Sequence, residues 1–171
     1  MTAKTILFVC TGNTCRSFMA EAMAKHYLAR LPQKKPEIRV ISAGTGAITD
    51  EPPSEHALTV LSMFGIKFNG HKSRSLWPEL IRKADLILVM TQRHKEHILN
   101  LLPDAQNKIF LLKEFARENE RKNDGAYEET NEDTNEDIMD PFGSSLEHYR
   151  LCAEELRVFV NKALDKLLKE K

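Results

Sequence analysis

Short apolar segments alternate along the chain with longer amphipathic segments. The apolar segments are residues 5–9, 38–41, 85–90 and 109–112, and the segment 85–90 is continuously apolar after its first residue. Such segments predict buried strands, and a continuous apolar run is typical of a central parallel strand. Strands that alternate with helices favour a four-stranded parallel sheet, with right-handed crossovers that place helices on both of its faces. We therefore expect an α/β fold.

The helices between these strands are indicated by apolar residues at helical spacing and by capping residues. Ser54 can begin one helix and Gly65 can end it, and Thr91 can cap a helix that stops before Pro103. The predicted helical segments are residues 19–31, 54–64, 76–84, 91–102 and 145–169. Cys152 lies near the apolar stripe of the last of these helices, so we expect it in the core.

Length and composition indicate one globular domain over residues 1–171. Hydrophobic residues make up 42% of the chain, and the 25 basic residues balance the 25 acidic ones. With no net charge, the chain has no global field that would attract nucleic acid or an anionic membrane. The sequence shows neither a signal peptide nor a segment of transmembrane length, and its three cysteines suit a reducing compartment. We expect a cytoplasmic monomer.

Residues 117–138 interrupt the alternating pattern. The sequence Thr-Asn-Glu-Asp occurs twice in succession there, and residues 128–137 contain six acids and no base. Such a segment can bury little apolar surface, so we expect an acidic, mobile insertion in the domain. A solvated insertion is the simpler interpretation, and an acidic lip that favours cationic regions of a substrate is the alternative.

Residues 9–17 read V-C-T-G-N-T-C-R-S and connect the first predicted strand to the first predicted helix. Gly12 and Asn13 tolerate unusual backbone angles, so the loop can curl and direct several amides at one anion. The unpaired amides at the start of the helix favour the same anion. Arg16 can hold two phosphate oxygens through its planar guanidinium. With Cys10 at the other end, the loop predicts a nucleophilic thiolate that faces a phosphate site.

The segment C-T-G-N-T-C-R-S after an apolar strand resembles the loop of the low-molecular-weight protein tyrosine phosphatase family, and Asp140-Pro141-Phe142-Gly143 matches the late acid motif of that family. The resemblance extends over nearly the whole chain. Thr14 resembles the protein-arginine phosphatase branch, because tyrosine phosphatases usually carry isoleucine there. One departure is Phe18, which stands where the family commonly has proline.

The resemblance implies a role for each matching residue and a phosphocysteine intermediate. Cys10 is the expected nucleophile, Arg16 holds the phosphoryl oxygens, and Asp140 is the acid and then the base. Phe142 and Ile48 are expected beside the substrate, and Ser42 and His71 are expected to support the loop. The remaining residues of the expected phosphate-binding loop are Thr11, Gly12, Asn13, Thr14, Cys15 and Ser17. This chemistry requires neither a metal nor a cofactor.

Several other interpretations remain at this point. The substrates are expected to be phosphorylated proteins, with phosphoarginine favoured and phosphotyrosine as the alternative. An arsenate reductase would need a resolving cysteine, for which only Cys152 is available late in the chain, and a non-enzymatic phosphate-binding module would need no acid. A metal site could involve His94 and His97, but both are expected to be solvated. Cys15 lies close enough in sequence to trap an oxidised Cys10 as a disulfide.

Overall fold

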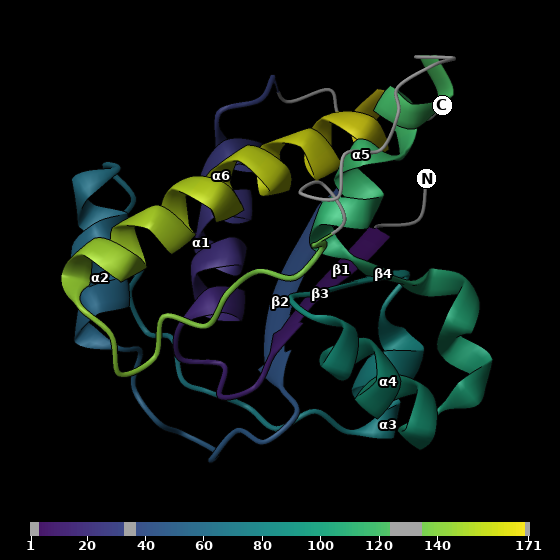
Figure 1. The fold of residues 1–171 in the computed structure, drawn as a ribbon, viewed down its shortest axis with the longest axis horizontal. Coiled ribbons are helices and arrows are strands. Elements are labelled where there is room, and N and C mark those ends of the chain that lie inside the picture. Colours follow the sequence, from purple (N-terminus) through teal and green to yellow (C-terminus); the bar gives the residue numbers. More distant parts are fainter. Residues whose placement is uncertain (1–3, 33–36, 124–134, 170–171) are drawn as a thin grey trace.

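The computed structural model describes residues 4–32, 37–123 and 135–169, and the side chains of residues 118–123 are left out (Figure 1). The four predicted strands and the predicted helices are present in the expected order. The elements are β1 (Lys4–Cys10), α1 (Arg16–Ala29), β2 (Ile38–Gly44), α2 (Glu55–Met63), α3 (Pro78–Lys83), β3 (Leu86–Val89), α4 (Gln92–Leu101), the 3-10 helix η1 (Pro103–Lys108), β4 (Ile109–Leu111), α5 (Leu112–Asn123) and α6 (Leu146–Lys169). Of these, α5 is a further helix that the sequence pattern did not predict.

The four strands form one parallel sheet in the order β2-β1-β3-β4. In this sheet β1 is central, and Phe8 pairs in register with Ser42 of β2 and with Leu88 of β3. All four residues of β3 are buried, as expected for the strand predicted at the centre of the sheet. Since all strands are parallel, their carboxyl ends meet at one edge, which is the usual position of a ligand site in such sheets.

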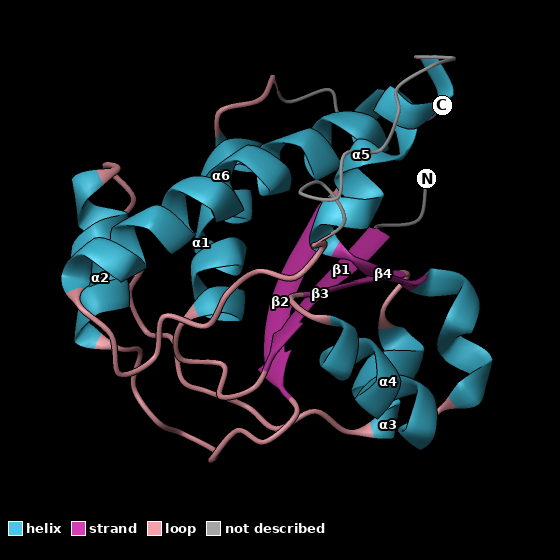
Figure 2. Ribbon diagram, viewed as in Figure 1, coloured by secondary structure: helices cyan, strands magenta, loops and turns pink. Residues whose placement is uncertain are grey.

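Helices cover both faces of the sheet, as predicted (Figure 2). Ile6 and Phe8 of β1 pack into the larger core cluster, which includes buried residues of α1, α2, α5 and α6. Leu7 and Val9 point to the other face, where the smaller cluster includes residues of α3 and α4. Alternate residues of β1 therefore enter two different cores, because successive side chains of a strand point to opposite faces. Cys152 is 6% exposed in the larger cluster, which confirms its predicted place.

The segment 117–138 differs from the expectation at both ends. Its first residues are helical, since α5 continues to Asn123, whereas the mobility expected of the insertion stays a prediction. At its other end, Asp137 accepts a hydrogen bond from the backbone N–H of Gln92 at 2.8 Å, and its carbonyl accepts one from Lys113 Nζ at 2.9 Å. Ile138 is fully buried. Residues 124–134, which contain most of the acidic run, lie outside the described residues.

Within the described ranges, no helix is long and apolar enough to cross a membrane.

Candidate active site

The predicted phosphate-binding loop lies at the carboxyl end of β1. Cys10 is the last residue of the strand and Arg16 the first residue of α1. The end of β2 supports the loop, since Thr45 N–H donates to the Cys10 carbonyl at 2.9 Å and Gly46 N–H donates to the Thr11 carbonyl at 3.0 Å. Gly44 permits this approach, because a Cβ there would lie 2.3 Å from the Thr11 carbonyl oxygen.

Asn13 is the residue around which the loop curls. Its φ of 57° lies in the left-handed region, which asparagine tolerates better than most residues. Its buried amide nitrogen donates to Ser17 Oγ at 2.9 Å and to Ser42 Oγ at 2.8 Å, and its backbone carbonyl lies 2.8 Å from His71 Nε2. These are the contacts that the family resemblance implied for the loop. Arg74 adds one more, since its backbone N–H donates to Asn13 Oδ1 at 3.0 Å.

Glu21 completes this network, although sequence reasoning missed it. The Ser42 hydroxyl donates to the Glu21 carboxylate, and Lys25 Nζ lies 2.6 Å from the other carboxylate oxygen. Because Ser42 gives its proton to Glu21, its oxygen is left to accept the amide of Asn13. Glu21 is 6% exposed between two buried alanines of α1. An acid in an alanine-rich helical stretch was the signal that could have identified it.

Phe18 fills the position of the family proline with a side chain of the core. The ring is fully buried, and its centroid lies 4.4 Å from that of His71 and 5.4 Å from that of Phe68. Burial lowers the pKa of His71, which keeps the imidazole neutral beside the Asn13 carbonyl. In this chain Phe18 therefore packs against the residue that supports the loop.

The Cys10 thiol lies on the floor of the loop and is 2% exposed. Its sulfur is 2.9 Å from Ser17 Oγ and accepts the backbone N–H of Asn13 at 3.3 Å. Donors that converge on sulfur stabilise the thiolate, which is the nucleophilic form of cysteine. The geometry therefore suits a reactive thiol at this position.

Arg16 connects the loop to the acid motif. The guanidinium is almost completely buried, donates to the Ile138 carbonyl at 2.9 Å and lies 3.2 Å from Asp140 Oδ2. Ile138 is itself held by its backbone N–H, which donates to the Met90 carbonyl at the end of β3 at 2.7 Å. Asp140 also accepts the backbone N–H of Phe142 at 3.1 Å. The predicted acid is thus brought to the predicted phosphate clamp from the far end of the chain.

Three apolar side chains on segments next to this site are exposed. Phe142 and Ile48, both predicted beside the substrate, are 73% and 72% exposed, and Met139 is 71% exposed. Ile48 lies in the loop after β2, whose carbonyls at positions 47 and 48 accept hydrogen bonds from the hydroxyls of Ser75 and Ser73. Sequence reasoning did not include Met139, although it immediately precedes Asp140 in the acid motif. These side chains are free to contact a bound substrate.

Thr14 and Cys15 form the side of the loop that faces α2 and α6. The Thr14 carbonyl accepts the backbone N–H of Ser54 at 3.0 Å. The hydroxyl of Tyr149 lies 3.2 Å from Cys15 Sγ, and Ser54 Oγ donates to the same hydroxyl at 3.2 Å. Burial raises the pKa of Tyr149 to about 12, so the hydroxyl keeps its proton. Tyr149 thereby ties the loop to α2 and α6. The apolar stripe of the last predicted helix, to which Tyr149 belongs, did not reveal this role.

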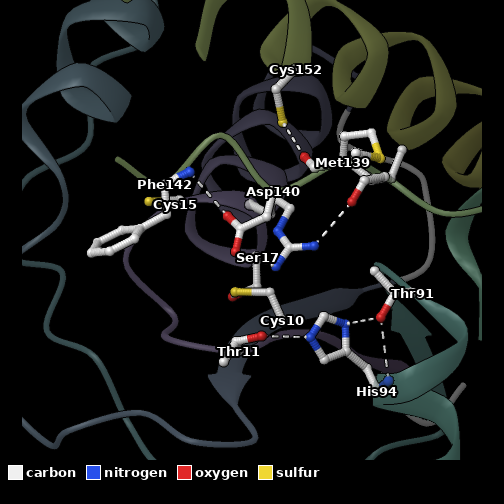
Figure 3. Close-up of polar contacts among 12 residues, drawn as sticks. Cys10, Thr11, Cys15, Ser17, Thr91, His94, Met139, Asp140, Phe142 and Cys152 are labelled. Atoms are coloured by element: carbon white, nitrogen blue, oxygen red, sulfur yellow. Dashed lines mark hydrogen bonds and ion pairs between the residues drawn. The ribbon is translucent and has the colours of Figure 1, made fainter. Parts of the chain in front are cut away.

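The prediction that His94 is solvated is wrong, because its side chain is buried, whereas His97 is exposed as expected. The His94 ring is 5% exposed, with Nε2 2.9 Å from Thr11 Oγ1 and Nδ1 3.0 Å from Thr91 Oγ1 (Figure 3). Burial, and to a lesser degree the Arg16 cation, lower the pKa of His94 to about 4, so the ring is neutral. Neighbours Lys95 and Glu96 suggested a polar face, but the ring of His94 points the other way, into the site.

The three cysteines of the chain are free thiols. Burial raises the pKa of the Cys152 thiol to about 12, and its sulfur contacts the Met139 carbonyl at 3.7 Å. In the described part of the chain, no three His, Cys, Asp or Glu residues are grouped so that they could hold a metal ion. The protective role expected of Cys15 stays a prediction.

Comparison with known proteins yields matches over nearly the full length. A protein-arginine-phosphatase of Geobacillus stearothermophilus is 37% identical over 165 residues, which cover 96% of this chain and 97% of the relative. A probable low molecular weight protein-tyrosine-phosphatase, EpsP, of Ralstonia nicotianae is 40% identical over 114 residues, which cover 67% of this chain and 74% of the relative.

A solved structure of the YwlE arginine phosphatase is also similar, with a TM-score of 0.80 and 34% identity, covering 98% of this chain and 97% of that one. That protein is a mutant in which a serine replaces the active-site cysteine, and this serine is phosphorylated. A model of the family described as low molecular weight phosphotyrosine protein phosphatase matches residues 5–171. With its loop, its acid motif and this match, the chain belongs to the low molecular weight phosphotyrosine protein phosphatase family.

Proposed function

We propose that this protein removes phosphoryl groups from phosphoarginine side chains of proteins, with Cys10 as the nucleophile. The observation that carries the chemistry is the convergence of Cys10, Arg16 and Asp140, in which the Arg16 guanidinium lies 3.2 Å from the Asp140 carboxylate above the thiol loop. The phosphorylated serine in the YwlE mutant supports this role for the residue at the same place in the loop.

In the first step the Cys10 thiolate attacks phosphorus in line with the leaving nitrogen. The sulfur–phosphorus bond forms as the phosphorus–nitrogen bond breaks, and Asp140 donates its proton to the departing guanidine. The backbone amides of the loop and the Arg16 guanidinium hold the equatorial oxygens, where charge develops. Asp140 is suited to this task because its carboxylate is half exposed, with a side-chain exposure of 49%, and so can reach a substrate.

In the second step a water molecule attacks the phosphocysteine while Asp140 takes its proton. The sulfur–phosphorus bond then breaks, inorganic phosphate leaves and the thiolate is restored. Ser17 Oγ, 2.9 Å from the Cys10 sulfur, donates a hydrogen bond that stabilises the leaving thiolate. The requirement for a free thiol at Cys10 also supports our proposal that the enzyme acts in a reducing compartment such as the cytoplasm.

Thr14 supports phosphoarginine over phosphotyrosine as the substrate. A guanidinium is planar and rich in N–H donors, and a threonine offers it a hydroxyl acceptor where tyrosine phosphatases of the family carry an apolar isoleucine. The hydrogen bond between the Thr14 carbonyl and the Ser54 N–H holds this residue at the edge of the loop. The protein-arginine-phosphatase of Geobacillus stearothermophilus, which matches over 96% of the chain, supports the same assignment.

The test compares kcat/KM for phosphoarginine and phosphotyrosine peptides in the wild type and in Thr14→Ile. We expect the wild type to prefer phosphoarginine and Thr14→Ile to reduce that preference roughly ten- to a hundredfold, because an N–H donor left without a partner in a closed site costs about 1–3 kcal/mol. Thr59→Ile, at an exposed position of α2, is the matched control and should keep the wild-type ratio. An unchanged ratio in Thr14→Ile would show that Thr14 does not set specificity.

The alternatives give different results in the same assays. A tyrosine phosphatase would hydrolyse phosphotyrosine faster than phosphoarginine in the wild type. A binding module would show no turnover that Cys10→Ser abolishes. An arsenate reductase would need Cys152 as a resolving thiol, and the burial that raises the pKa of this thiol to about 12 argues against that role.

A further inference from the structure

His94 has no part in the two chemical steps, yet it is built into the site. Both of its ring nitrogens have hydroxyl partners, Thr11 on one side and Thr91 on the other. A neutral imidazole has one donor and one acceptor nitrogen, so these two contacts satisfy the ring completely. Burying a polar ring without such partners is costly, so the two threonine hydroxyls are what allow His94 to lie inside the site.

Helix α4 holds the ring rigidly. Thr91 caps this helix, and its hydroxyl accepts the backbone N–H of His94 at 3.4 Å as well as contacting Nδ1. One turn further along α4, Ile98 is fully buried in the smaller core cluster. The backbone and the ring of His94 are thus fixed by the cap and by the core, and the Nε2 atom lies at a defined place beside the loop.

Thr11, the partner of Nε2, lies at a different depth from the rest of the loop. Cys10 and Asn13 are buried and form its floor, whereas Thr11 is exposed. The methyl group of Thr11 lies on the side of Gly46, 3.9 Å from where a Cβ of that residue would be, and its hydroxyl lies on the side of His94. The contact with His94 therefore selects one rotamer of Thr11 at the mouth of the loop.

We propose that His94 is a positioning residue that fixes the Thr11 side chain at the mouth of the loop, where the Thr11 hydroxyl contacts the group attached to the phosphoryl. The phosphoryl oxygens themselves are held deeper, by the loop amides and Arg16. A neutral ring suits this task, since a second cation beside Arg16 would add an unfavourable charge, and the acids on this side, Asp137 and Asp140, already have partners. The inference rests on the proposed attack by Cys10 but not on the choice between arginine and tyrosine substrates.

Two substitutions of His94 separate its two contacts. In His94→Gln the side-chain amide reaches the position of Nε2 and can still bond to Thr11, whereas in His94→Asn it reaches only the position of Nδ1 and bonds to Thr91. With the peptide that the wild type hydrolyses faster, we expect His94→Asn and Thr11→Val each to lower kcat/KM about tenfold. His94→Gln should stay within about threefold of the wild type. In the double variant His94→Asn/Thr11→Val, kcat/KM should fall no further than in Thr11→Val alone, because both changes remove the same contact between His94 and Thr11.

Inhibition by inorganic phosphate distinguishes positioning at the mouth from general support of the loop. Phosphate has no leaving group, so its inhibition constant should change by less than about twofold in all these variants. An inhibition constant for phosphate that rises by the same factor as kcat/KM falls would overturn the inference. Losses of kcat/KM that multiply in the double variant, or that are equal in His94→Gln and His94→Asn, would overturn it as well. If His94→Asn does not fold, the test compares kcat/KM in Thr11→Val, which lacks the hydroxyl, with kcat/KM in Thr11→Ser, which keeps it. A loss in Thr11→Val alone would support the inference, and equal losses in both would overturn it. Failure of the proposed function would instead appear as turnover by Cys10→Ser at the rate of the wild type.

Discussion

The buried His94 should make the stability of the protein depend on pH in a way that one substitution removes. Burial lowers the pKa of this imidazole from 6.5 to about 4 in the folded protein. In the unfolded chain the ring is solvated and its pKa is that of an ordinary histidine. Between these two values the unfolded state therefore binds a proton that the folded state does not, and acidification favours unfolding.

The size of the effect follows from the two pKa values. The stability contributed by the neutral ring is fully present above the unfolded pKa and is lost as the pH falls toward the folded pKa. Proton linkage gives a loss of about 2 kcal/mol between pH 7 and pH 5, and about 3 kcal/mol by pH 4. His71, whose pKa burial also lowers, contributes a loss of the same sign in every variant that retains it.

The assay is urea denaturation followed by circular dichroism at several pH values, in the wild type and in His94→Gln, which cannot titrate. We expect the free energy of unfolding of the wild type to fall about 2 kcal/mol more than that of His94→Gln between pH 7 and pH 5. His97→Gln changes an exposed histidine of the same helix and should follow the wild type. Parallel losses in the wild type and His94→Gln would refute the argument that burial holds this ring neutral.

Two further predictions concern the supports of the loop and of the acid. Tyr149→Phe removes the hydroxyl between Cys15 and Ser54 and should lower the free energy of unfolding by about 1–3 kcal/mol in urea, because the buried Cys15 and the half-buried Ser54 each lose a partner; an unchanged midpoint would contradict the bridging role. Ile138→Ala empties a fully buried site and should cost about 2–5 kcal/mol of stability by the same measurement, whereas Ile138→Val should cost about 0.5–1.5 kcal/mol. Equal stability of the two Ile138 variants would show that the segment before Asp140 is not anchored by its side chain.

The sheet and the phosphate-binding loop could be predicted because their signals are local. Each strand is a short apolar run, and the loop combines Gly12, Asn13 and Arg16 within a few residues of the strand end. The register of β1 with β2 and β3 then follows from burial of alternate side chains on two faces. The family resemblance supplied Asp140, which no local rule connects with Cys10.

The environment of His94 could not be predicted with the same ease, because it depends on a contact across 83 positions of the chain. A signal was nevertheless present, since Thr91, His94 and Ile98 recur at the spacing of one helical face, and Ile98 is a core residue. The charged neighbours of His94 outweighed that signal in the sequence interpretation. The docking of Asp137 and Ile138 was missed for a related reason, because an acidic composition says nothing about partners such as Gln92 N–H and Lys113.

The pairing of Arg16 with the Ile138 carbonyl has a consequence for the synthesis of the protein. The two residues are separated by 122 positions, and Tyr149, which braces Cys15, follows later still. A chain that leaves the ribosome from its N-terminus therefore exposes the reactive loop long before the residues that complete it are available. The contact closes a loop of this length, so it can form only after the segment around Ile138 has been synthesised and can pack against the start of α1. A nascent chain is thus an inactive phosphatase, and catalytic competence becomes one of the last properties that the folding protein acquires.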